Sequence, residues 1–349
     1  MSEWQLYKLN FERNPVHFGE LGIGLEETSD FIHSDTLFSA WVSAYARLLG
    51  KDAVEELLQQ FQAETEPLFR LSSTFIYRQI NEETIYYLPR PLKRPVNYPD
   101  DDLEFSKAYK KLNYLPLEIW QRWYQGEGWK ESDTEELKAK AKAKKGEKID
   151  GELAKAETFN YGEAVQKGKV PKIAVDRTTR ATNIYHTNFV YFKENAGLYF
   201  IVEFSNPEFK NTFLTILKFL GEEGIGGERS SGAGQFQVES SELTDEWEQV
   251  IKFDKGKFHS LISLFWEKSL SESFLEKSSY ELLRRGGWIS SSPSGSQRRR
   301  QSVQMFAEGS VFRVQPKGQL ANVTPDGFKV HQIYRSGISL SLSIKALVE

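Results

Sequence analysis

Residues 224–236 constrain this chain most, because five of these thirteen residues are glycine and two are serine. Glycine adopts positive φ at little cost, and its missing Cβ lets a ligand approach the backbone. The apolar residues between Phe209 and Leu220 recur at helical spacing and predict a helix that ends near Gly221. Phe236 and Val238 alternate with polar residues and predict a strand. The glycine loop therefore connects a helix to a strand.

This order of elements bears on the ligand that the loop could hold. In the familiar nucleotide-binding loops a strand leads into a helix, whose N-terminus holds the phosphates. Here the loop follows a helix, and it lacks the Lys-Ser/Thr pair of a P-loop. We favour a polyanion with many phosphates, which backbone N–H groups and Arg229 can follow, over a mononucleotide cofactor. A long flexible connection without a ligand is the alternative that the loop sequence leaves open.

Composition limits the class of protein. A chain of 349 residues, 39% of them hydrophobic, can form two or three domains with cores of their own. The net charge of −4 argues against a protein that coats nucleic acid through bulk electrostatics, so any such site must be local. Cysteine is absent, which excludes disulfides and thiolate chemistry. Residues 1–10 lack signal-peptide features, and no apolar run approaches the ~18 residues of a membrane span, so we expect a cytoplasmic protein.

The first 240 residues predict two β-α-β units separated by an insertion, an expanded ferredoxin-like plan. The first unit has a strand at residues 4–9, a helix capped by Ser34 or Asp35 and closed by Gly50, a shorter helix, and strands at 71–80 and 84–88. In the second, residues 188–192 and 198–204 are expected to form the arms of a hairpin before the helix and glycine loop. Three alternating prolines in residues 89–95 begin the insertion.

The insertion carries two biased stretches. A Ser132-x-x-Glu135 capping box predicts a lysine-rich helix, for which a solvated surface is favoured and an RNA contact is the alternative. Aromatic residues crowd residues 120–129 and could form either an exposed partner surface or part of the core. Beyond Leu243, short strands at 259–266, 303–306, 310–314 and 338–344 predict a second sheet domain.

No catalytic constellation stands out. The five histidines are scattered without metal-ligand spacing. Adjacent residues at a helix start do not form a catalytic triad, so helix capping explains Ser34 and Asp35 better. His17, at a strand end, could act as a general acid or base, bond a phosphate, or be a structural residue.

Basic residues cluster beside glycine and serine. Arginine next to small residues suits bidentate phosphate contacts that do not read bases. The clusters are Arg177 with Arg180, Arg284 with Arg285, and Arg298-Arg299-Arg300 in the loop at 290–300, although the last alone would usually be a mobile loop.

Several stretches together resemble one family. They are Val16-His17-Phe18-Gly19, residues 32–40, Pro89-Arg90-Pro91-Leu92, Val175-Asp176-Arg177, the glycine loop, Arg285-Gly286-Gly287-Trp288 and Gly309-Ser310-Val311-Phe312. In this order, over nearly the whole chain, they resemble the RAMP proteins of CRISPR systems, and among these the family of fourth Csm subunits of type III-A interference complexes.

The resemblance implies an α+β fold of two ferredoxin-like (RRM-like) domains. They would span residues 1–242, with a thumb-like insertion at about 89–187, and residues 243–349. It also implies a non-catalytic subunit that needs no cofactor and supports antiviral defence. Such a subunit grips the crRNA 5′ tag and bridges the Cas10-type large subunit to the neighbouring backbone RAMP subunit.

Carried onto this sequence, the resemblance places the glycine loop along the crRNA backbone and Arg177 and Arg180 in the thumb. The full set of expected RNA-binding residues is His17, Ser34, Arg177, Arg180, Gly226, Gly227, Arg229, Ser230, Ser231, Gly232, Gly234, Arg284 and Arg285. Two alternatives stay open. One is a metal-independent crRNA-processing endoribonuclease of the same superfamily that uses His17, and the other is a purely protein-binding scaffold.

Overall fold

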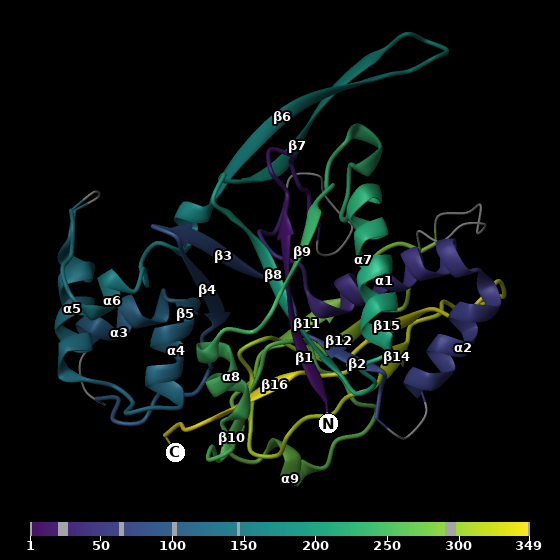
Figure 1. The fold of residues 1–349 in the computed structure, drawn as a ribbon. Coiled ribbons are helices and arrows are strands. Elements are labelled where there is room, and N and C mark those ends of the chain that lie inside the picture. The colour runs from purple at the N-terminus through teal and green to yellow at the C-terminus, as the bar shows by residue number, and fades with distance from the viewer. Residues whose placement is uncertain are drawn as a thin grey trace.

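The computed structural model describes residues 2–19, 27–62, 66–99, 103–144, 147–289 and 298–347. It is a mixed α/β protein whose strands all pair antiparallel in the sheets that are described (Figure 1). The helices are α1 (Ser34–Leu49), α2 (Lys51–Gln62), α3 (Leu103–Lys110), α4 (Leu117–Tyr124), α5 (Glu131–Lys142), α6 (Glu152–Lys155), α7 (Phe209–Glu223), α8 (Asp245–Lys252) and α9 (Glu272–Leu275), with short 3-10 helices η1 (Tyr161–Ala164) and η2 (Arg229–Ser231).

One large sheet organises the molecule. It has seven strands in the order β5-β4-β3-β8-β1-β9, with β2 also paired to β8. These strands are β1 (Glu3–Asn10), β2 (Phe69–Leu71), β3 (Phe75–Ile80), β4 (Glu83–Pro89), β5 (Tyr114–Pro116), β8 (Ala196–Phe204) and β9 (Gln237–Ser241). The two central strands β1 and β8 pair along seven residues of each. Strand β8 is almost entirely apolar, β1 mixes apolar and polar residues, and both are largely buried on both faces, as strands covered from two sides must be.

Helices α1 and α7 cover one face of this sheet. Tyr7 and Phe200 point to that face and join a core cluster with residues of both helices. Trp41 of α1 stacks on Phe213 of α7 with ring centroids 5.1 Å apart, and its indole N–H donates to the Phe213 carbonyl at 3.1 Å. This pairing fixes α7 on the sheet and thereby positions the glycine loop that follows it.

The insertion and the C-terminal segment cover the opposite face. Leu6, Tyr199 and Ile201 belong to a second core cluster that includes the aromatic residues of α4. Trp120, Trp123 and Tyr124 are fully buried and Trp129 is nearly so. The prediction that residues 120–129 form an exposed partner surface is therefore wrong, and core packing is confirmed.

The lysine-rich helix is confirmed, but its cap is not the predicted one. Helix α5 begins at Glu131, and Asp133 rather than Glu135 closes the capping box by accepting the Lys130 backbone N–H at 3.0 Å. Asp133 is buried and also accepts two hydrogen bonds from Arg122, at 2.6 and 3.0 Å. This buried ion pair sets the helix start, a tertiary contact that a local motif cannot reveal.

The predicted hairpin between residues 188–192 and 198–204 does not form. Strand β7 (Thr182–Phe192) pairs with β6 (Val165–Val175) over eleven residues, whereas β8 enters the large sheet. The β6–β7 hairpin projects well beyond the rest of the molecule (Figure 1). Only its base is buried, at Phe189, Val190 and Phe192, so its outer part has no core to lie against.

The C-terminal strands form three small sheets among the described residues. The strands are β10 (Phe258–Leu261), β11 (Leu282–Arg285), β12 (Val303–Phe306), β13 (Val311–Phe312), β14 (Leu320–Asn322), β15 (Tyr334–Ser336) and β16 (Ser341–Ile344). Their orders are β13-β10-β16, β11-β12 and β14-β15. Leu342 and Ile344 share the second core cluster with the insertion, so this segment packs on the body instead of around a single sheet of its own.

Candidate functional site

The glycine loop adopts the positive φ angles that its composition predicts. Helix α7 runs two residues beyond Gly221. Because Gly221 has no side chain, Phe236 can pack against it: a Cβ at this position would lie 2.4 Å from the Phe236 carbonyl oxygen. The helix ends at Gly224 with φ 79°, and Gly226, Gly232 and Gly234 also have φ between 82° and 96°. Strand β9 follows, so the order of helix, loop and strand is confirmed.

The inner part of the loop packs on the segment after β1. The Gly227 N–H donates to the His17 carbonyl at 2.8 Å, and the Gly234 N–H donates to the Pro15 carbonyl at 2.9 Å. A Cβ on Gly226 would lie 2.5 Å from the His17 carbonyl oxygen, so only glycine fits this contact. The backbone of residues 15–17 thus acts as the floor of the loop.

His17 supports this floor. Its side chain is buried, its Nδ1 lies 2.8 Å from the Asn188 carbonyl of β7, and its ring contacts Phe189 edge-on with centroids 6.3 Å apart. A Cβ on Gly227 would lie 2.8 Å from His17 Cδ2. These contacts are those of a structural histidine that joins the glycine loop to the base of the β6–β7 hairpin.

The outer part of the loop faces solvent. Arg229, Ser230 and Ser231 form η2, and all three are exposed together with Gly232. The residue before η2, Glu228, has left-handed backbone geometry, and its carboxylate pairs with Lys172 of β6. Lys172 also lies 3.5 Å from the Ser231 hydroxyl. The exposed turn is therefore tied to the hairpin, and Arg229 is exposed to solvent on this turn.

Arg177 and Arg180 lie at the tip of the β6–β7 hairpin. Both are exposed. Arg177 is five residues beyond Lys172, which corresponds to about 17 Å at the ~3.4 Å per residue of a β-strand. Asp176 orders the turn by accepting the backbone N–H groups of Thr179 at 2.6 Å and Thr178 at 2.8 Å. The Thr179 and Thr178 hydrogen bonds hold the pKa of Asp176 below its usual value. The tip thus presents two cations on an ordered turn.

Ser34 and Arg285 occupy a buried polar cluster, not a surface. Ser34 accepts the Leu264 N–H at 2.9 Å, and Asp35 accepts two hydrogen bonds from Arg285, at 3.0 and 3.1 Å. Arg335 also pairs with Asp35, and all three charged side chains are almost fully buried. The N-cap of α1 is His33, so the prediction that Ser34 or Asp35 caps this helix is wrong. Because Ser34 and Arg285 are buried and hydrogen-bonded to other residues of this chain, we no longer propose that they contact RNA.

The other arginines of the C-terminal segment are more accessible. Arg284 is exposed and reaches the Ser302 hydroxyl at 3.2 Å, and Arg299 lies over the Trp288 ring at 4.9 Å. Burial and the charge of Arg335 lower the pKa of Arg300 to about 10. Residues 290–297 of the predicted arginine-rich loop lie outside the described residues.

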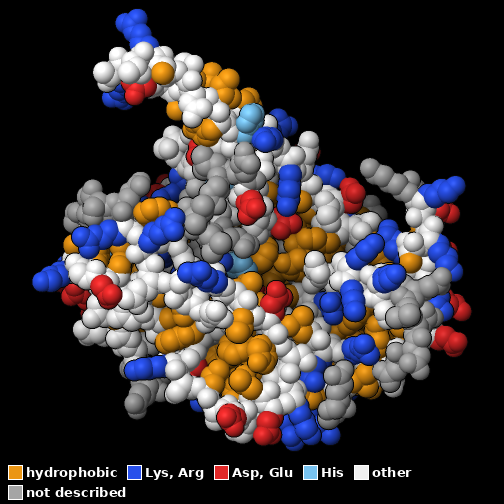
Figure 2. All heavy atoms as spheres, turned by 180° about the vertical axis from the view of Figure 1, so that it is seen from behind, with side chains coloured by type: hydrophobic (Ala, Val, Ile, Leu, Met, Phe, Trp, Pro, Cys, Tyr) orange, Lys and Arg blue, Asp and Glu red, His pale blue; other side chains and the backbone are white. Residues whose placement is uncertain are grey.

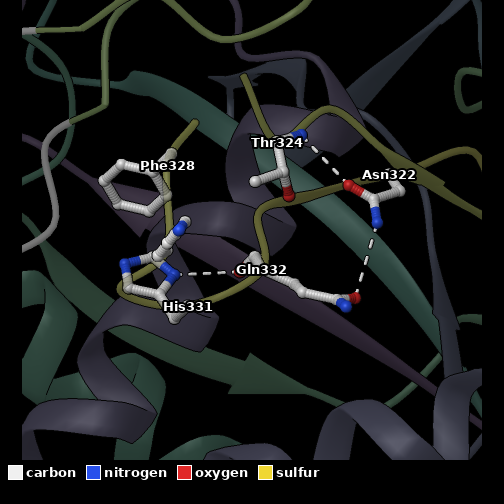
Figure 3. A pocket seen from close by; sticks show the side chains of 6 residues that line it. Asn322, Thr324, Phe328, His331 and Gln332 are labelled. Carbon is white, nitrogen blue, oxygen red and sulfur yellow. Dashed lines mark hydrogen bonds between the residues drawn. The ribbon is translucent and has the colours of Figure 1, made fainter. Parts of the chain in front are cut away.

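A shallow pocket of about 330 Å³ lies beside β14 and β15 (Figure 3). Its polar side chains largely bond to one another or to nearby backbone: Asn322 accepts the Thr324 N–H at 3.0 Å and lies 3.4 Å from Gln332. His331 Nδ1 lies 2.9 Å from the Gln332 carbonyl. With its polar groups occupied in this way, the pocket offers no reactive arrangement.

The described part of the chain contains no group of three or more His, Asp or Glu side chains placed to hold a metal. In the same residues, no helix is both long and apolar enough to cross a membrane.

The structure brings together the glycine loop, His17 and the base of the hairpin, but it leaves Arg177, Arg180 and Arg284 elsewhere. Sequence reasoning missed Lys172, Pro15 and Asn188. Lys172 falls at an alternating position of a strand, a pattern shared with many solvated lysines, so nothing in the sequence distinguishes it.

Comparisons with known proteins match nearly the whole length of the chain to related families. A family model of the RAMP superfamily matches residues 13–237, and one for the CRISPR Csm4 C-terminal domain matches residues 254–344. A Thermococcus onnurineus (strain NA1) protein named CRISPR system Cms protein Csm4 is 27% identical over 330 residues, covering 90% of this chain and 92% of that protein. A Mycobacterium tuberculosis (strain H37Rv) protein of the same name is 26% identical over 341 residues, covering 97% of each.

Solved structures share the fold. A chain in the crystal structure of a Csm3-Csm4 subcomplex in the type III-A CRISPR-Cas interference complex aligns with a TM-score of 0.59 and 20% identity, covering 97% of this chain and 99% of that one. A chain in a Csm1-Csm4 cassette in complex with pppApA aligns with a TM-score of 0.56 and 19% identity, covering 99% of both.

Proposed function

The chain belongs to the RAMP superfamily, and from that premise we propose that it is the Csm4-type subunit of a type III CRISPR-Cas complex that grips the crRNA 5′ tag without cleaving it. The observation that carries this proposal is the exposed turn of residues 229–232, held on a fixed floor and carrying one arginine and two serine hydroxyls. Such a turn offers backbone and side-chain donors to successive phosphates.

The arrangement of the large sheet supports a ferredoxin-like first domain. Strands β1, β3, β8 and β9 lie in the order β3-β8-β1-β9, with α1 after β1 and α7 between β8 and β9. A βαββαβ unit has this connectivity, with the insertion between its second and third strands. The projecting β6–β7 hairpin would then be the thumb, with Arg177 and Arg180 reaching the boundary between tag and guide.

We further propose that the subunit bridges a Cas10-type large subunit and a backbone RAMP subunit. The relatives in the two solved assemblies are found with Csm1 and with Csm3, which is the support for two partners. The outer hairpin presents Ile173, Val175 and Ile184 to solvent, each more than half exposed. Exposed apolar side chains on a projecting element suit contact with a neighbouring molecule.

The decisive variant is Arg229→Glu, assembled with its partner subunits and crRNA. Because the guanidinium is exposed at the turn, reversing its charge should lower the amount of RNA retained in the complex about tenfold or more without affecting folding. Arg313→Glu is the matched control, since Arg313 is exposed in the C-terminal segment and its substitution makes the same change of charge. Equal RNA content in both purified complexes would contradict the proposal.

The absence of catalysis is also a proposal, and the burial of His17 supports it. The His17 ring is engaged by Asn188 and Phe189, and its contacts include no second acid or base among the described residues. Repeat RNA incubated with the purified protein without metal should stay intact. Cleavage that disappears in His17→Ala would establish the endoribonuclease alternative instead.

A further inference from the structure

A groove with a volume of about 980 Å³ lies beside helices α3 and α5. One wall comes from α3 and the end of α5, and the other from residues 30–31, 113–114, 158–159 and 161–162. Its volume is at the upper end of the range typical of ligand sites. Neither the glycine loop nor the hairpin tip contributes to it.

Lysines dominate the charge of this groove. Lys107, Lys111, Lys140 and Lys142 line it, against a single carboxylate, Asp30. Lys107, Lys111 and Lys140 are exposed and form no ion pair with any residue that the structure describes. Figure 2 shows Lys and Arg side chains gathered on the right, the side of the molecule that holds α3 and α5 in Figure 1, with hydrophobic side chains between them. On a chain of net charge −4, this is a local concentration of positive charge.

Helix dipoles explain only part of the pattern. Lysine near the C-terminus of a helix is favourable, and both α3 and α5 end beside the groove. The dipole effect does not require side chains of two helices to line one cavity. Their mutual repulsion there is a cost that an anion in the groove would relieve.

Aromatic rings form the opposite wall. Tyr114 stacks on Tyr161 with centroids 4.3 Å apart and planes 6° apart, and Phe31 meets Tyr114 edge-on at 6.1 Å. Phe159 is half-buried, and the Lys140 ammonium lies 5.0 Å above its ring. Cations facing half-buried aromatic rings are what single-stranded nucleic acid needs, with phosphates on one side and bases on the other. An acidic peptide would use the lysines but not the rings.

The groove is joined to the glycine loop through the backbone. The His17 carbonyl accepts the Gly227 N–H, and the next residue, Phe18, pairs with Ser29 immediately before the groove residues Asp30 and Phe31. We propose that the lysine groove is a second RNA-binding site of this subunit, which holds the phosphodiester backbone of a single-stranded segment of the RNA gripped by the glycine loop. This inference rests on the proposed RNA-gripping function.

The test uses the subunit assembled with its partners and crRNA, and compares Lys107→Glu/Lys111→Glu/Lys140→Glu with Lys255→Glu/Lys257→Glu/Lys268→Glu. The control lysines are also exposed, and they lie outside the groove. RNA affinity is measured as a function of salt concentration, and RNA–protein crosslinks are mapped. The groove variant should bind RNA at least tenfold more weakly, with a salt slope smaller by about 2, because three phosphate contacts to a single strand are lost. Crosslinks to α3 and α5 should disappear while those to residues 226–232 remain.

Unchanged affinity and slope in the groove variant would overturn the inference. Loss of a partner subunit with RNA affinity intact would also overturn it, because the groove would then hold an acidic protein surface. Failure of the proposed function looks different: Arg229→Glu would retain RNA fully, and wild-type crosslinks would be missing from residues 226–232.

Discussion

Asp35 lies fully buried in the first turn of α1 and joins two segments that are far apart in the sequence. Arg285 and Arg335, its partners, come from β11 and β15. Burial alone would raise the pKa of this carboxyl, but Arg335 and Arg285 outweigh burial and hold the pKa well below its usual value. The cluster therefore fastens the C-terminal segment to α1.

Replacing Asp35 with Asn should destabilise the protein by about 3–5 kcal/mol, since two buried guanidinium groups lose their counter-charge. The free energy of unfolding from chemical denaturation measures this loss. Asp254→Asn, at an exposed position, is the control and should change stability by less than about 0.5 kcal/mol. Equal effects of the two substitutions would show that the buried pair contributes little.

The same cluster predicts acid sensitivity. The pKa of Glu308 is also held low, because His33 and Ser73 outweigh the effect of burial. Carboxyls with depressed folded-state pKa values stabilise the protein above their ordinary pKa of about 4, and this stability is lost as the pH falls towards the folded-state value. Unfolding free energy should therefore fall between about pH 5 and pH 3, with a smaller slope in Asp35→Asn. A slope that is equal in both proteins would contradict this assignment.

For individual residues, the sequence predicted that Ser34, Asp35 and His17 have special roles but not which contacts they make. Ser34 and Asp35 have the composition of a helix cap, and a cap is a local motif. Their actual partners lie 230 to 300 residues away, so local spacing could not identify them. His17 was predicted with three possible roles, and only its packing against Asn188 and Phe189 separates them.

Among the elements, the glycine loop was predicted best. Its φ angles and its place between helix and strand follow from composition and periodicity, which are local properties. The pairing of β7 was predicted incorrectly because a short apolar stretch shows that a strand exists but not which strand it joins. The exposed outer half of the hairpin gives almost no hydrophobic pattern from which its length could be predicted.

Substitutions at two glycines of the loop can distinguish the cost of a steric clash from the cost of backbone strain. Gly232 and Gly234 have φ of 82° and 83°, but a Cβ on Gly232 meets open space, whereas one on Gly234 would lie 2.1 Å from the Ile225 carbonyl oxygen. Gly232→Ala should cost about 1 kcal/mol of stability, and Gly234→Ala about 1–3 kcal/mol more. Thermal unfolding of the two variants measures the difference. Equal midpoints would mean that residues 225 and 234 are not packed as described.

The outer hairpin should be dispensable for folding. Replacing residues 174–183 with Asn-Gly joins Ile173 to its partner Ile184 through a two-residue turn. Because both side chains are exposed, the midpoint of thermal unfolding should shift by only a few degrees, while RNA crosslinks to the tip disappear. A large loss of stability would show that the hairpin contributes to the fold.

For the whole molecule, charge is organised locally. The chain is acidic overall, yet Arg229, the hairpin tip and the lysine groove each present cations to solvent. Affinity for a polyanion therefore depends on placing several separate contacts along one strand, which an assembled particle with a fixed RNA path provides. This distribution is consistent with a subunit that holds RNA within a complex.

The most direct test of this account is a map of RNA–protein crosslinks in the assembled complex with its crRNA. The account predicts crosslinks from the 5′ tag to residues 226–232 of this chain, and their loss in Arg229→Glu but not in Arg313→Glu. Crosslinks of the tag confined to neighbouring subunits would contradict it and would leave this chain a protein-binding scaffold.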